Sequence, residues 1–452
     1  MSGTSQDSAF TRGSLVYNKK TLFSLFFWIL WGDFCLQFME VVVAAVLPLL
    51  MTQWKAPAII IGLFVTTIPA LLNFVITPLV SVWSDRHRGK WGRRIPFLLV
   101  PTPFVVLFLL GIAGAEPVAH ALQWLVGSAW SFETCRLVVL GFMIVAFQVA
   151  HMVVASVYYY LFNDVVPEPR MGRFLGLFRI VSIAAGACFH FFVFPRADGN
   201  APQIFALSAL VYGVGFGLMC LKVREGTYPE PEPLDSRHPL HTAMLLLREC
   251  FSTRFFRTYA LFNGAFAFAM AWNAFMQVMR VNAGVSYAEI GMLMGIASAV
   301  SALTSYPVGV LVDRFRPFAV AIAGLILLTA GQSFYLPLFA PDLPAGTSFW
   351  VMGFAVLVTT VGLSVFQGAA MPLHMYVFPK ERYGQFCGAL AMLNALASML
   401  GGLVAGGLTS LIQGWWGDRI GWAFAPIGMS LSLALCLALL VNSRRLWGSR
   451  PE

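Results

Sequence analysis

Charged residues are scarce in this sequence. Of its 452 residues only 11% are charged, while 59% are hydrophobic. A water-soluble fold cannot bury so large an apolar fraction, because its surface needs polar and charged side chains. The composition therefore excludes a soluble globular protein and predicts a chain that crosses a membrane many times.

Signatures of common enzyme and metal sites are also missing. The seven cysteines show no CxxC spacing and lie mostly inside apolar runs, so neither a disulfide framework nor a metal site is expected. No HExxH motif, glycine-rich nucleotide loop or serine–histidine arrangement is present. We therefore expect no enzymatic activity, no cofactor and no use of ATP, so any transport must draw on an ion gradient.

Long apolar runs make up most of the chain and predict an all-α polytopic membrane protein with twelve transmembrane helices. A membrane-spanning helix needs about 20 apolar residues. The predicted spans are residues 21–50, 57–83, 95–114, 137–161, 173–194, 201–221, 256–280, 288–312, 317–338, 348–376, 382–412 and 421–441. An even number of spans places both termini on one side of the membrane.

Basic residues are distributed unequally between the two sides of this topology. All but six of the 29 lysines and arginines fall in segments on the side of the termini. The exceptions are Lys55, Arg136, Arg179, Arg196, Arg280 and Arg419. This asymmetry is the positive-inside pattern, which predicts cytoplasmic termini and a cell membrane, here a bacterial inner membrane. It also accounts for the net charge of +9 without a nucleic-acid partner.

The longest polar stretch, residues 222–255, has proline at every second position from Pro229 to Pro233. Such a sequence excludes a helix and favours an extended linker. We therefore predict five parts, which are a cytoplasmic tail (1–20), an N-terminal six-helix bundle (21–221), the linker (222–255), a C-terminal six-helix bundle (256–441) and a second tail (442–452).

Two loops of the first half recur in the second half. The pair Asp85-Arg86 after the second span matches Asp313-Arg314 after the eighth. Residues 167–176 and 379–388 both fit the pattern Pro-x-x-Arg-x-Gly-x-Phe-x-Gly. This repetition indicates an internal duplication, with two six-helix halves related by a pseudo-twofold axis along the membrane normal.

The loop between the second and third spans carries the most specific motif. It reads Asp85-Arg86, five residues, Gly92-Arg93-Arg94, one residue, then Pro96-Phe97. This pattern resembles the corresponding loop of the major facilitator superfamily, and its spacing is similar to that of the glycoside–pentoside–hexuronide cation symporters and the plant-type sucrose–proton symporters. Residues 163–179 resemble the loop between helices 4 and 5 of the same symporters. The resemblance implies alternating access to a substrate site near the bilayer midplane.

By this resemblance, the acid of the motif belongs to a charge lock that holds a cytoplasmic gate shut. The expected gate residues are Asp85, Arg86, Arg93, Arg94, Asp164, Asp313 and Arg314. The alternative is a basic loop that only fixes topology, which explains the arginines. It does not explain an acid at the C-terminal end of a helix, where the helix dipole disfavours negative charge.

Two acids, Asp33 and Glu40, lie two helical turns apart on one face of the first span. An ionisable side chain inside a membrane is costly, so each acid is a candidate for proton coupling. We predict that Asp33 pairs with Arg179 of the fifth span and Glu40 with Arg136 of the fourth, and that protonation weakens one pairing as substrate binds. The alternative is a set of permanent ion pairs that fasten the first span to its neighbours.

Sodium coupling is a competing interpretation, because some of the resembling symporters use sodium. They supply carboxylates from helices 2 and 4, and hard cations need several oxygen ligands. Here the second span has no acid, and the fourth has none before Asp164 at its end. We therefore favour protons.

Amides combined with aromatic rings suit a neutral polyol, since each amide matches a hydroxyl while a ring covers the apolar face of the sugar. The candidate substrate residues are Trp31, Gln37, His151, Trp272, Asn273, Gln277 and Gln367. The alternative for the amides is hydrogen bonding between helices. For His151 the alternatives are a proton relay or a structural hydrogen bond.

Together these features predict a monomeric proton-coupled symporter whose partners are a proton and a sugar, glycoside or similar hydroxylated solute. An exporter, or a carrier of another organic solute, is the first alternative, and a lipophilic solute would suit the 14% aromatic residues. A non-transporting membrane sensor is the second, although it would call for a large soluble domain that the chain does not contain.

Overall fold

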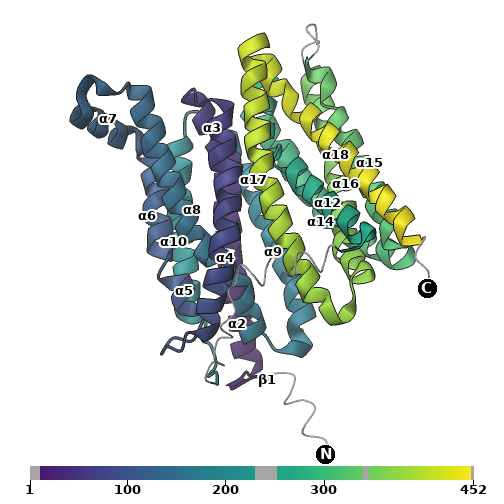
Figure 1. Cartoon of the computed structure of the whole chain (residues 1–452). Coiled ribbons are helices and arrows are strands. Elements are labelled where there is room, and N and C mark those ends of the chain that lie inside the picture. Colours follow the sequence, from purple (N-terminus) through teal and green to yellow (C-terminus); the bar gives the residue numbers. More distant parts are fainter. Residues whose placement is uncertain (1–10, 230–251, 340–345, 449–452) are drawn as a thin grey trace, which may run out of the picture. The chain divides into compact units, whose positions relative to one another are not determined.

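The computed structural model describes residues 11–229, 252–339 and 346–448, apart from the side chain of residue 381. These residues are almost entirely helical, which confirms the predicted fold class (Figure 1). Eleven helices in the described part are long and apolar enough to cross a membrane. A short antiparallel hairpin of β1 (Thr11–Arg12) and β2 (Leu15–Val16) precedes them.

The helices follow the predicted spans closely. The first half contains α2 (Lys19–Gln53), α3 (Ala58–Gly62), α4 (Ile68–Arg86), α5 (Ile95–Leu99), α6 (Thr102–Ala113), α7 (Ala115–Val126), α8 (Phe132–Val165), α9 (Met171–Cys188) and α10 (Ala201–Lys222). The second half contains α12 (Arg254–Met270), α13 (Asn273–Asn282), α14 (Tyr287–Arg314), α15 (Pro317–Ser333), α16 (Thr347–Val377), α17 (Tyr383–Trp416) and α18 (Asp418–Gly448). The π-helical turns η2 (Leu63–Thr67) and η5 (Phe189–Val193) continue α3 and α9.

Two features differ from the sequence-based expectation. The seventh span is not one helix, because α12 ends at Met270 and α13 begins at Asn273. The segment between the third and fourth spans, expected to be a loop, contains α7, which Figure 1 shows turned away from the helices beside it. Trp124 and Leu125 of α7 are 87% and 76% exposed, so this helix leaves apolar side chains uncovered.

The packing divides the chain into two compact units. Unit 1 contains the residues up to Leu50 and from Leu72 to Pro233, and unit 2 contains Met51–Leu71 together with the chain from Leu234 onward. The first part of the second span therefore packs with unit 2, which the predicted bundle boundaries, 21–221 and 256–441, do not anticipate. Otherwise those boundaries remain a prediction.

Glycine explains how Met51–Leu71 reaches unit 2. A Cβ atom on Gly62 would lie 2.3 Å from the carbonyl oxygen of Gly402, and one on Gly406 would lie 2.8 Å from that of Ala58. The absence of side chains thus lets α3 and α17 approach backbone to backbone. The Thr67 hydroxyl adds a hydrogen bond of 2.9 Å to the carbonyl oxygen of Met399.

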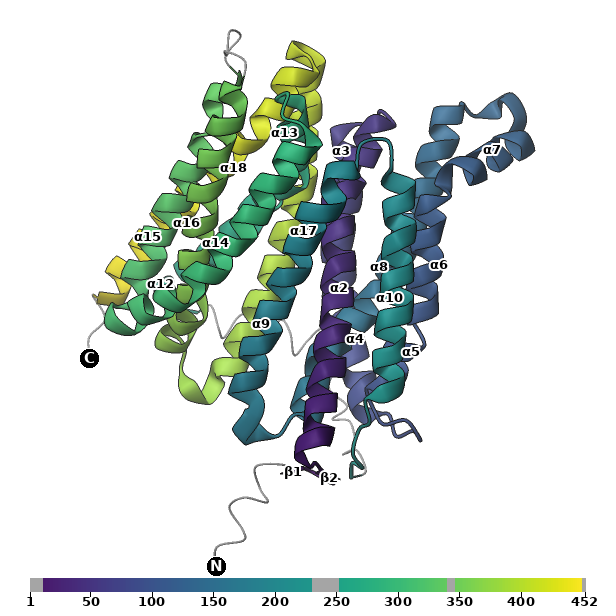
Figure 2. The same cartoon turned by 180° about the vertical axis from the view of Figure 1, so that it is seen from behind.

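Within unit 1, α2 is the central helix and runs between α9 and α10 (Figure 2). A Cβ atom on Gly215 of α10 would lie 2.3 Å from the sulfur of Cys35, which shows how closely α10 approaches α2. On another side the hydroxyl of Tyr158 in α8 donates to the carbonyl oxygen of Ile29 at 2.7 Å. The middle of α2, which carries Asp33, therefore lies inside unit 1.

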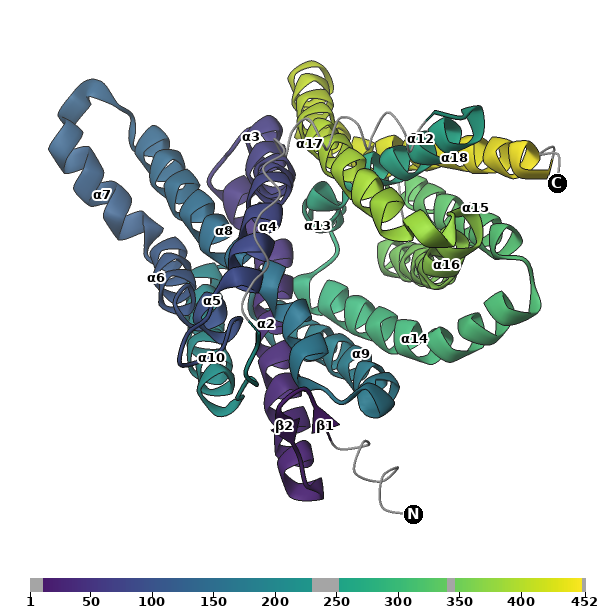
Figure 3. The ribbon, with the colours of Figure 1, turned by 60° about the horizontal axis from the view of Figure 1, so that its bottom comes forward.

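Within unit 2, α15 and α16 form the closest helix pair and lie side by side in Figure 3. A Cβ atom on Gly324, Gly331 or Gly362 would lie 2.4 to 2.5 Å from an atom of the facing helix. Close glycine contacts of this kind are how apolar helices associate in a membrane, where lipid is as apolar as leucine.

The repeated loop motif adopts the same local structure twice. Pro167 and Pro379 have nearly equal backbone angles, with φ −59 and ψ 134 in one and φ −58 and ψ 131 in the other. Each is followed by one turn of 3-10 helix, η4 (Glu168–Arg170) and η8 (Lys380–Arg382), and then directly by a long helix. The sequence repeat is therefore also a structural repeat.

Candidate functional site

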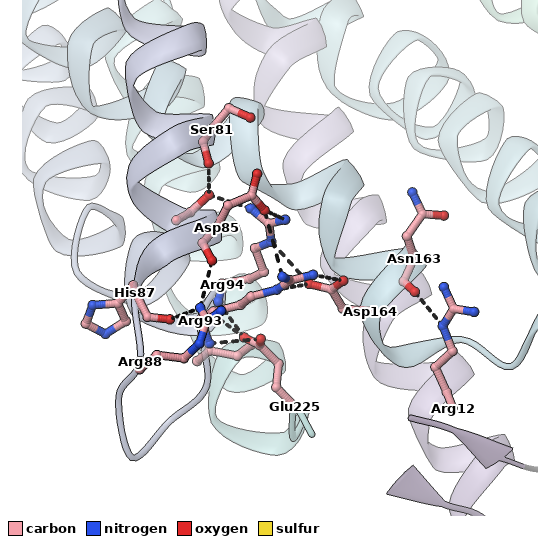
Figure 4. A network of polar contacts seen from close by, with 12 residues as sticks. Arg12, Ser81, Asp85, His87, Arg88, Arg93, Arg94, Asn163, Asp164 and Glu225 are labelled. Carbon is pink, nitrogen blue, oxygen red and sulfur yellow. Dashed lines mark hydrogen bonds and ion pairs between the residues drawn. The ribbon is translucent and has the colours of Figure 1, made fainter. Parts of the chain in front are cut away.

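Four charged residues of unit 1 gather at the end of α4, the start of α5 and the end of α8 (Figure 4). We call Asp85, Arg93, Arg94 and Asp164 the charge cluster. Asp164 accepts hydrogen bonds from Nε of Arg93 at 2.8 Å and from Nε of Arg94 at 3.2 Å. Arg94 also donates to Asp85, and Nη1 of Arg93 lies 3.9 Å from the same carboxylate. The hydrogen bonds from Arg93 to Asp164 raise the pKa of this arginine, so it stays charged.

Glu225, three residues beyond the end of α10, completes this end of unit 1. Its carboxylate accepts hydrogen bonds from the backbone N–H groups of Arg93, Arg94 and Ile95 at 3.0, 2.8 and 2.6 Å. These N–H groups lie at the start of α5, and the first N–H groups of a helix have no partner within the helix. Glu225 therefore caps α5 from another segment and holds the two arginines in place.

The chain after Glu225 covers the charge cluster. The ring centre of Tyr228 lies 4.1 Å from the guanidinium carbon of Arg93, which fits a cation–π contact. Burial raises the pKa of Tyr228, so its ring stays neutral. Residues 223–229 have no helix, as expected for the linker, and residues 230–251 lie outside the described chain.

The N-terminal hairpin docks on the same side of unit 1. Arg12 of β1 donates to the carbonyl oxygen of Asn163 at 2.6 Å, and the hydroxyl of Tyr17 donates to that of Val165 at 3.0 Å. Burial raises the pKa of Tyr17 to about 12, which keeps this hydroxyl protonated and able to donate. The predicted tail of residues 1–20 is thus partly folded, and residues 1–10 lie outside the description.

The structure brings together four of the seven predicted gate residues. Arg86 is half-buried beside them. Asp313 and Arg314, which end α14, are exposed, and neither has an ion pair among the described side chains. The second copy of the motif lacks the Gly-Arg-Arg sequence that builds the charge cluster in the first, so a gate role for Asp313 and Arg314 remains a prediction.

Asp33 is completely buried in the middle of α2. The hydroxyl of Ser182 in α9 donates to its Oδ2 at 2.6 Å, while Oδ1 has no hydrogen-bond partner among the described residues. The predicted pairing with Arg179 is wrong. Arg179 precedes Ser182 on α9 by three residues, but its side chain is exposed, and the smaller Ser182 takes the place next to the acid.

The second predicted pairing, Glu40 with Arg136, is also wrong. Nε2 of His151 in α8 lies 3.3 Å from Oε1 of Glu40, and Nε2 of Gln37 donates to its Oε2 at 3.0 Å. Arg136 instead lies 3.9 Å from Glu116, because α7 brings that acid back toward the start of α8. The three side chains Gln37, Glu40 and His151 thus form one polar group on the α2–α8 contact.

Two of the three substrate candidates around α13 are core residues. Trp272 is 2% exposed and packs on α18, where a Cβ atom on Gly428 would lie 2.3 Å from its ring. Gln277 accepts a hydrogen bond of 3.2 Å from Arg280, which also donates to the Tyr335 hydroxyl at 3.1 Å. This packing makes Trp272 and Gln277 part of the core of unit 2, and a substrate role for them remains a prediction.

Of the other substrate candidates, all but His151 are at least partly exposed. Trp31 is 40% exposed and stacks on Phe34 with ring centres 5.8 Å apart. Asn273 and Gln367 are exposed and Gln37 is half-buried. His151 is buried, and its Nε2 lies 3.3 Å from Oε1 of Glu40. This contact favours a role of His151 in the polar group with Gln37 and Glu40 over a direct contact with substrate.

Sequence reasoning missed Ser182, Glu225 and Tyr228. A serine inside an apolar helix carries no signal of its own, since serine is common in membrane spans. Glu225 follows the last apolar turn of α10, a position where an acid opposes the helix dipole, and that conflict was the available signal.

The comparisons with known proteins agree with this fold. Among solved structures, a nucleoside transporter, NupG (D323A mutant), is 12% identical, with 92% of this chain and 99% of that chain covered and a TM-score of 0.68. A bacterial homologue of the human lysosomal transporter Spinster, inward-facing and occupied, is 15% identical, with 96% and 98% covered and a TM-score of 0.67. A D-xylose–proton symporter is 14% identical, with 92% and 97% covered and a TM-score of 0.62.

These identities are low, so the structures establish the fold alone. No curated protein is significantly similar in sequence. The family model of the Major Facilitator Superfamily, however, matches residues 29–402, which are most of the chain. The solved structures similar to this chain are transporters and not enzymes. With its helical architecture, its duplicated loops and its charge cluster, the chain belongs to the Major Facilitator Superfamily.

Proposed function

We propose that this protein is a secondary active transporter that couples the uptake of a sugar, glycoside or similar hydroxylated solute to a proton. The observation that carries the proposal is Asp33, which is fully buried and whose contact among the described residues is the Ser182 hydroxyl and no cation. A buried carboxylate without a cation is costly in its charged form. Asp33 is therefore suited to bind a proton in one state of the transport cycle and release it in another.

Glu40 on the same helix and His151 on α8 supply a second titratable pair. Glu40 follows Asp33 by seven residues, about 10 Å along α2. Its side chain is 33% exposed, whereas Asp33 is closed off. Chains of Asp, Glu and His commonly serve as proton relays in membranes. We assign to this pair the exchange of protons between Asp33 and the outer solution.

The substrate class rests on the accessible side chains. In unit 1, Trp31 offers a ring face and Gln37 an amide that both donates and accepts hydrogen bonds. In unit 2, Asn273 and Gln367 offer amides of the same kind. On α2 alone, the Trp31 ring and the Gln37 amide suit the apolar face and a hydroxyl of a sugar. Solved proteins of similar fold are described as a D-xylose–proton symporter and a nucleoside transporter, and both descriptions are compatible with this class.

A carrier of a more lipophilic solute is the second candidate. Phe34 stacks between Trp31 and Phe38 on α2, with ring centres 5.8 and 6.3 Å away, and such an aromatic row suits an apolar ligand. For either solute we propose a monomer in a cell membrane, with both termini in the cytoplasm.

The test is uptake of radiolabelled solutes into proteoliposomes under an imposed pH gradient, with and without sodium. The panel contains a pentose, a hexose, a disaccharide, a nucleoside and an amphipathic aromatic compound. The proposal predicts accumulation of a hydroxylated solute when the outside is acidic, without a requirement for sodium. Sodium-dependent accumulation, or movement of the aromatic compound alone, would contradict it.

A further inference from the structure

A pocket of about 410 Å³ lies at the end of α10, separate from α2 and its acids. Lys90 and Trp91 line it from the segment between α4 and α5, and Leu221 and Arg224 line it from the end of α10 and the residues that follow. Its size is within the range of small-molecule sites. All of its lining residues belong to unit 1.

A tight turn presents Lys90 and Trp91 to this pocket. The N–H of Gly92 donates to the carbonyl oxygen of Gly89 at 3.1 Å, so the two residues between them form the tip of the turn. Gly92 has φ 98, a conformation that favours glycine. A Cβ atom there would lie 2.6 Å from Cβ of Glu225, so the turn rests directly on the segment that carries Arg224.

The pocket is positively charged. The side chains of Lys90 and Arg224 are exposed, and neither forms an ion pair with another described residue. The one acid in the lining, Glu225, already accepts three backbone N–H groups at the start of α5. Its charge is therefore largely compensated, and the two cations remain available to an anion.

An apolar strip continues the pocket along α10. Leu221 is 59% exposed, and Leu218, Val214 and Leu210, which precede it on α10, are 40%, 54% and 62% exposed. Their spacing of three or four residues places them on one helical face. The strip is about 16 Å long, roughly the length of an extended acyl chain. Trp91, in the pocket at the Leu221 end of the strip, is 57% exposed, as is typical of tryptophan at a membrane interface.

We propose that this pocket binds an anionic phospholipid of the cytoplasmic leaflet. Lys90 and Arg224 hold the phosphodiester headgroup, the Trp91 ring lies at the level of the glycerol backbone, and one acyl chain follows the strip from Leu221 to Leu210. Basic pockets at the cytoplasmic ends of membrane helices are suited to such headgroups. The apolar strip selects a lipid over a soluble phosphate, because a free anion gains nothing from it.

The test is native mass spectrometry of the full-length protein during titration with phosphatidylglycerol. The variant Lys90→Gln/Arg224→Gln removes both cations, and Lys19→Gln/Lys20→Gln removes the same charge from exposed residues at the start of α2, outside the pocket. We expect the first variant to bind the highest-affinity lipid about tenfold more weakly and the second to bind like the parent protein. Equal loss in both variants, or no loss in either, would overturn the proposal.

A second measurement locates the lipid and identifies its source. Phosphatidylglycerol with brominated chains quenches nearby tryptophans, so Trp91→Phe is expected to remove the quenching phase that saturates first. Water-soluble glycerophosphoglycerol is expected not to displace the lipid. Unchanged quenching in Trp91→Phe would place the lipid elsewhere, and displacement by the soluble headgroup would show that the pocket is a phosphate site and not a lipid site.

Discussion

Arg93 and Asp164 are joined by two parallel hydrogen bonds, from Nε to Oδ2 at 2.8 Å and from Nη2 to Oδ1 at 2.5 Å. This is the bidentate geometry that makes arginine–carboxylate pairs both strong and directional. The Asp164 side chain is 9% exposed, whereas that of Asp85 is 50% exposed. The two acids of the charge cluster therefore share arginines but differ in solvent access.

This difference predicts unequal costs for two matched substitutions. Asp164→Asn leaves a mostly buried pair of arginines without their main partner and is expected to destabilise the protein by about 3 to 5 kcal/mol. Asp85→Asn removes a half-exposed charge and is expected to cost about 1 kcal/mol or less. Thermal unfolding of the purified variants measures both. Equal shifts in the unfolding temperature would contradict the conclusion that Asp164, and not Asp85, is the main partner of the two arginines.

Sequence reasoning predicted the fold for a physical reason, and it also named all four residues of the charge cluster. A membrane admits few architectures, so the lengths of the apolar runs determine the helices almost directly. The residues of the charge cluster were predicted from the resemblance of residues 85–97 and 163–179 to loops of the Major Facilitator Superfamily. Arg93, Arg94, Asp85 and Asp164 could therefore be named before their contacts were known.

The partners of the buried acids could not be predicted in the same way. Arg179 was chosen as the partner of Asp33 because opposite charges attract. Ser182, about one helical turn further along α9, faces the acid instead, and Arg179 is exposed. The choice of Arg136 for Glu40 failed because α7, which carries Glu116, was not expected. Which face a helix presents depends on packing, and apolar spans have little amphipathic signal to reveal it.

The cap on α5 predicts a local effect of Glu225→Gln. The variant keeps one acceptor oxygen but loses the charge shared by three N–H groups, with an expected cost of about 1 to 3 kcal/mol. Hydrogen exchange of the backbone amides of residues 93–95 should become faster. Glu168→Gln is the control, since its carboxylate is 80% exposed and pairs only with Arg12 among the described residues. Similar exchange in both variants would rule out a capping role.

The contact between α3 and α17 predicts different tolerances at two adjacent glycines. A Cβ atom on Gly406 would lie 2.8 Å from backbone atoms of Ala58 and Ile59, while one on Gly407 would meet nothing within 4 Å. Gly406→Ala is therefore expected to destabilise the protein by about 1 to 3 kcal/mol and Gly407→Ala to have little effect. Thermal unfolding in detergent compares them, and equal stability of the two variants would argue against the close backbone contact.

The buried group around Arg280 predicts a structural effect without a change in substrate affinity. Tyr335→Phe removes an acceptor at 3.1 Å from Arg280, with an expected cost of about 1 to 3 kcal/mol. Because this group does not face the substrate in our account, KM for the transported solute should stay unchanged while the unfolding temperature falls. A large rise in KM at unchanged stability would instead place Arg280 and Tyr335 in the substrate site.

Asp33→Asn in proteoliposomes tests proton coupling most directly. The side chain keeps its shape and its neighbour Ser182 but can no longer exchange a proton, and Asp198→Asn in an exposed turn is the matched control. The account predicts that Asp33→Asn loses accumulation driven by an imposed pH gradient, retains exchange of labelled for unlabelled solute, and that the control keeps both. Accumulation by Asp33→Asn at the level of the parent protein would contradict it.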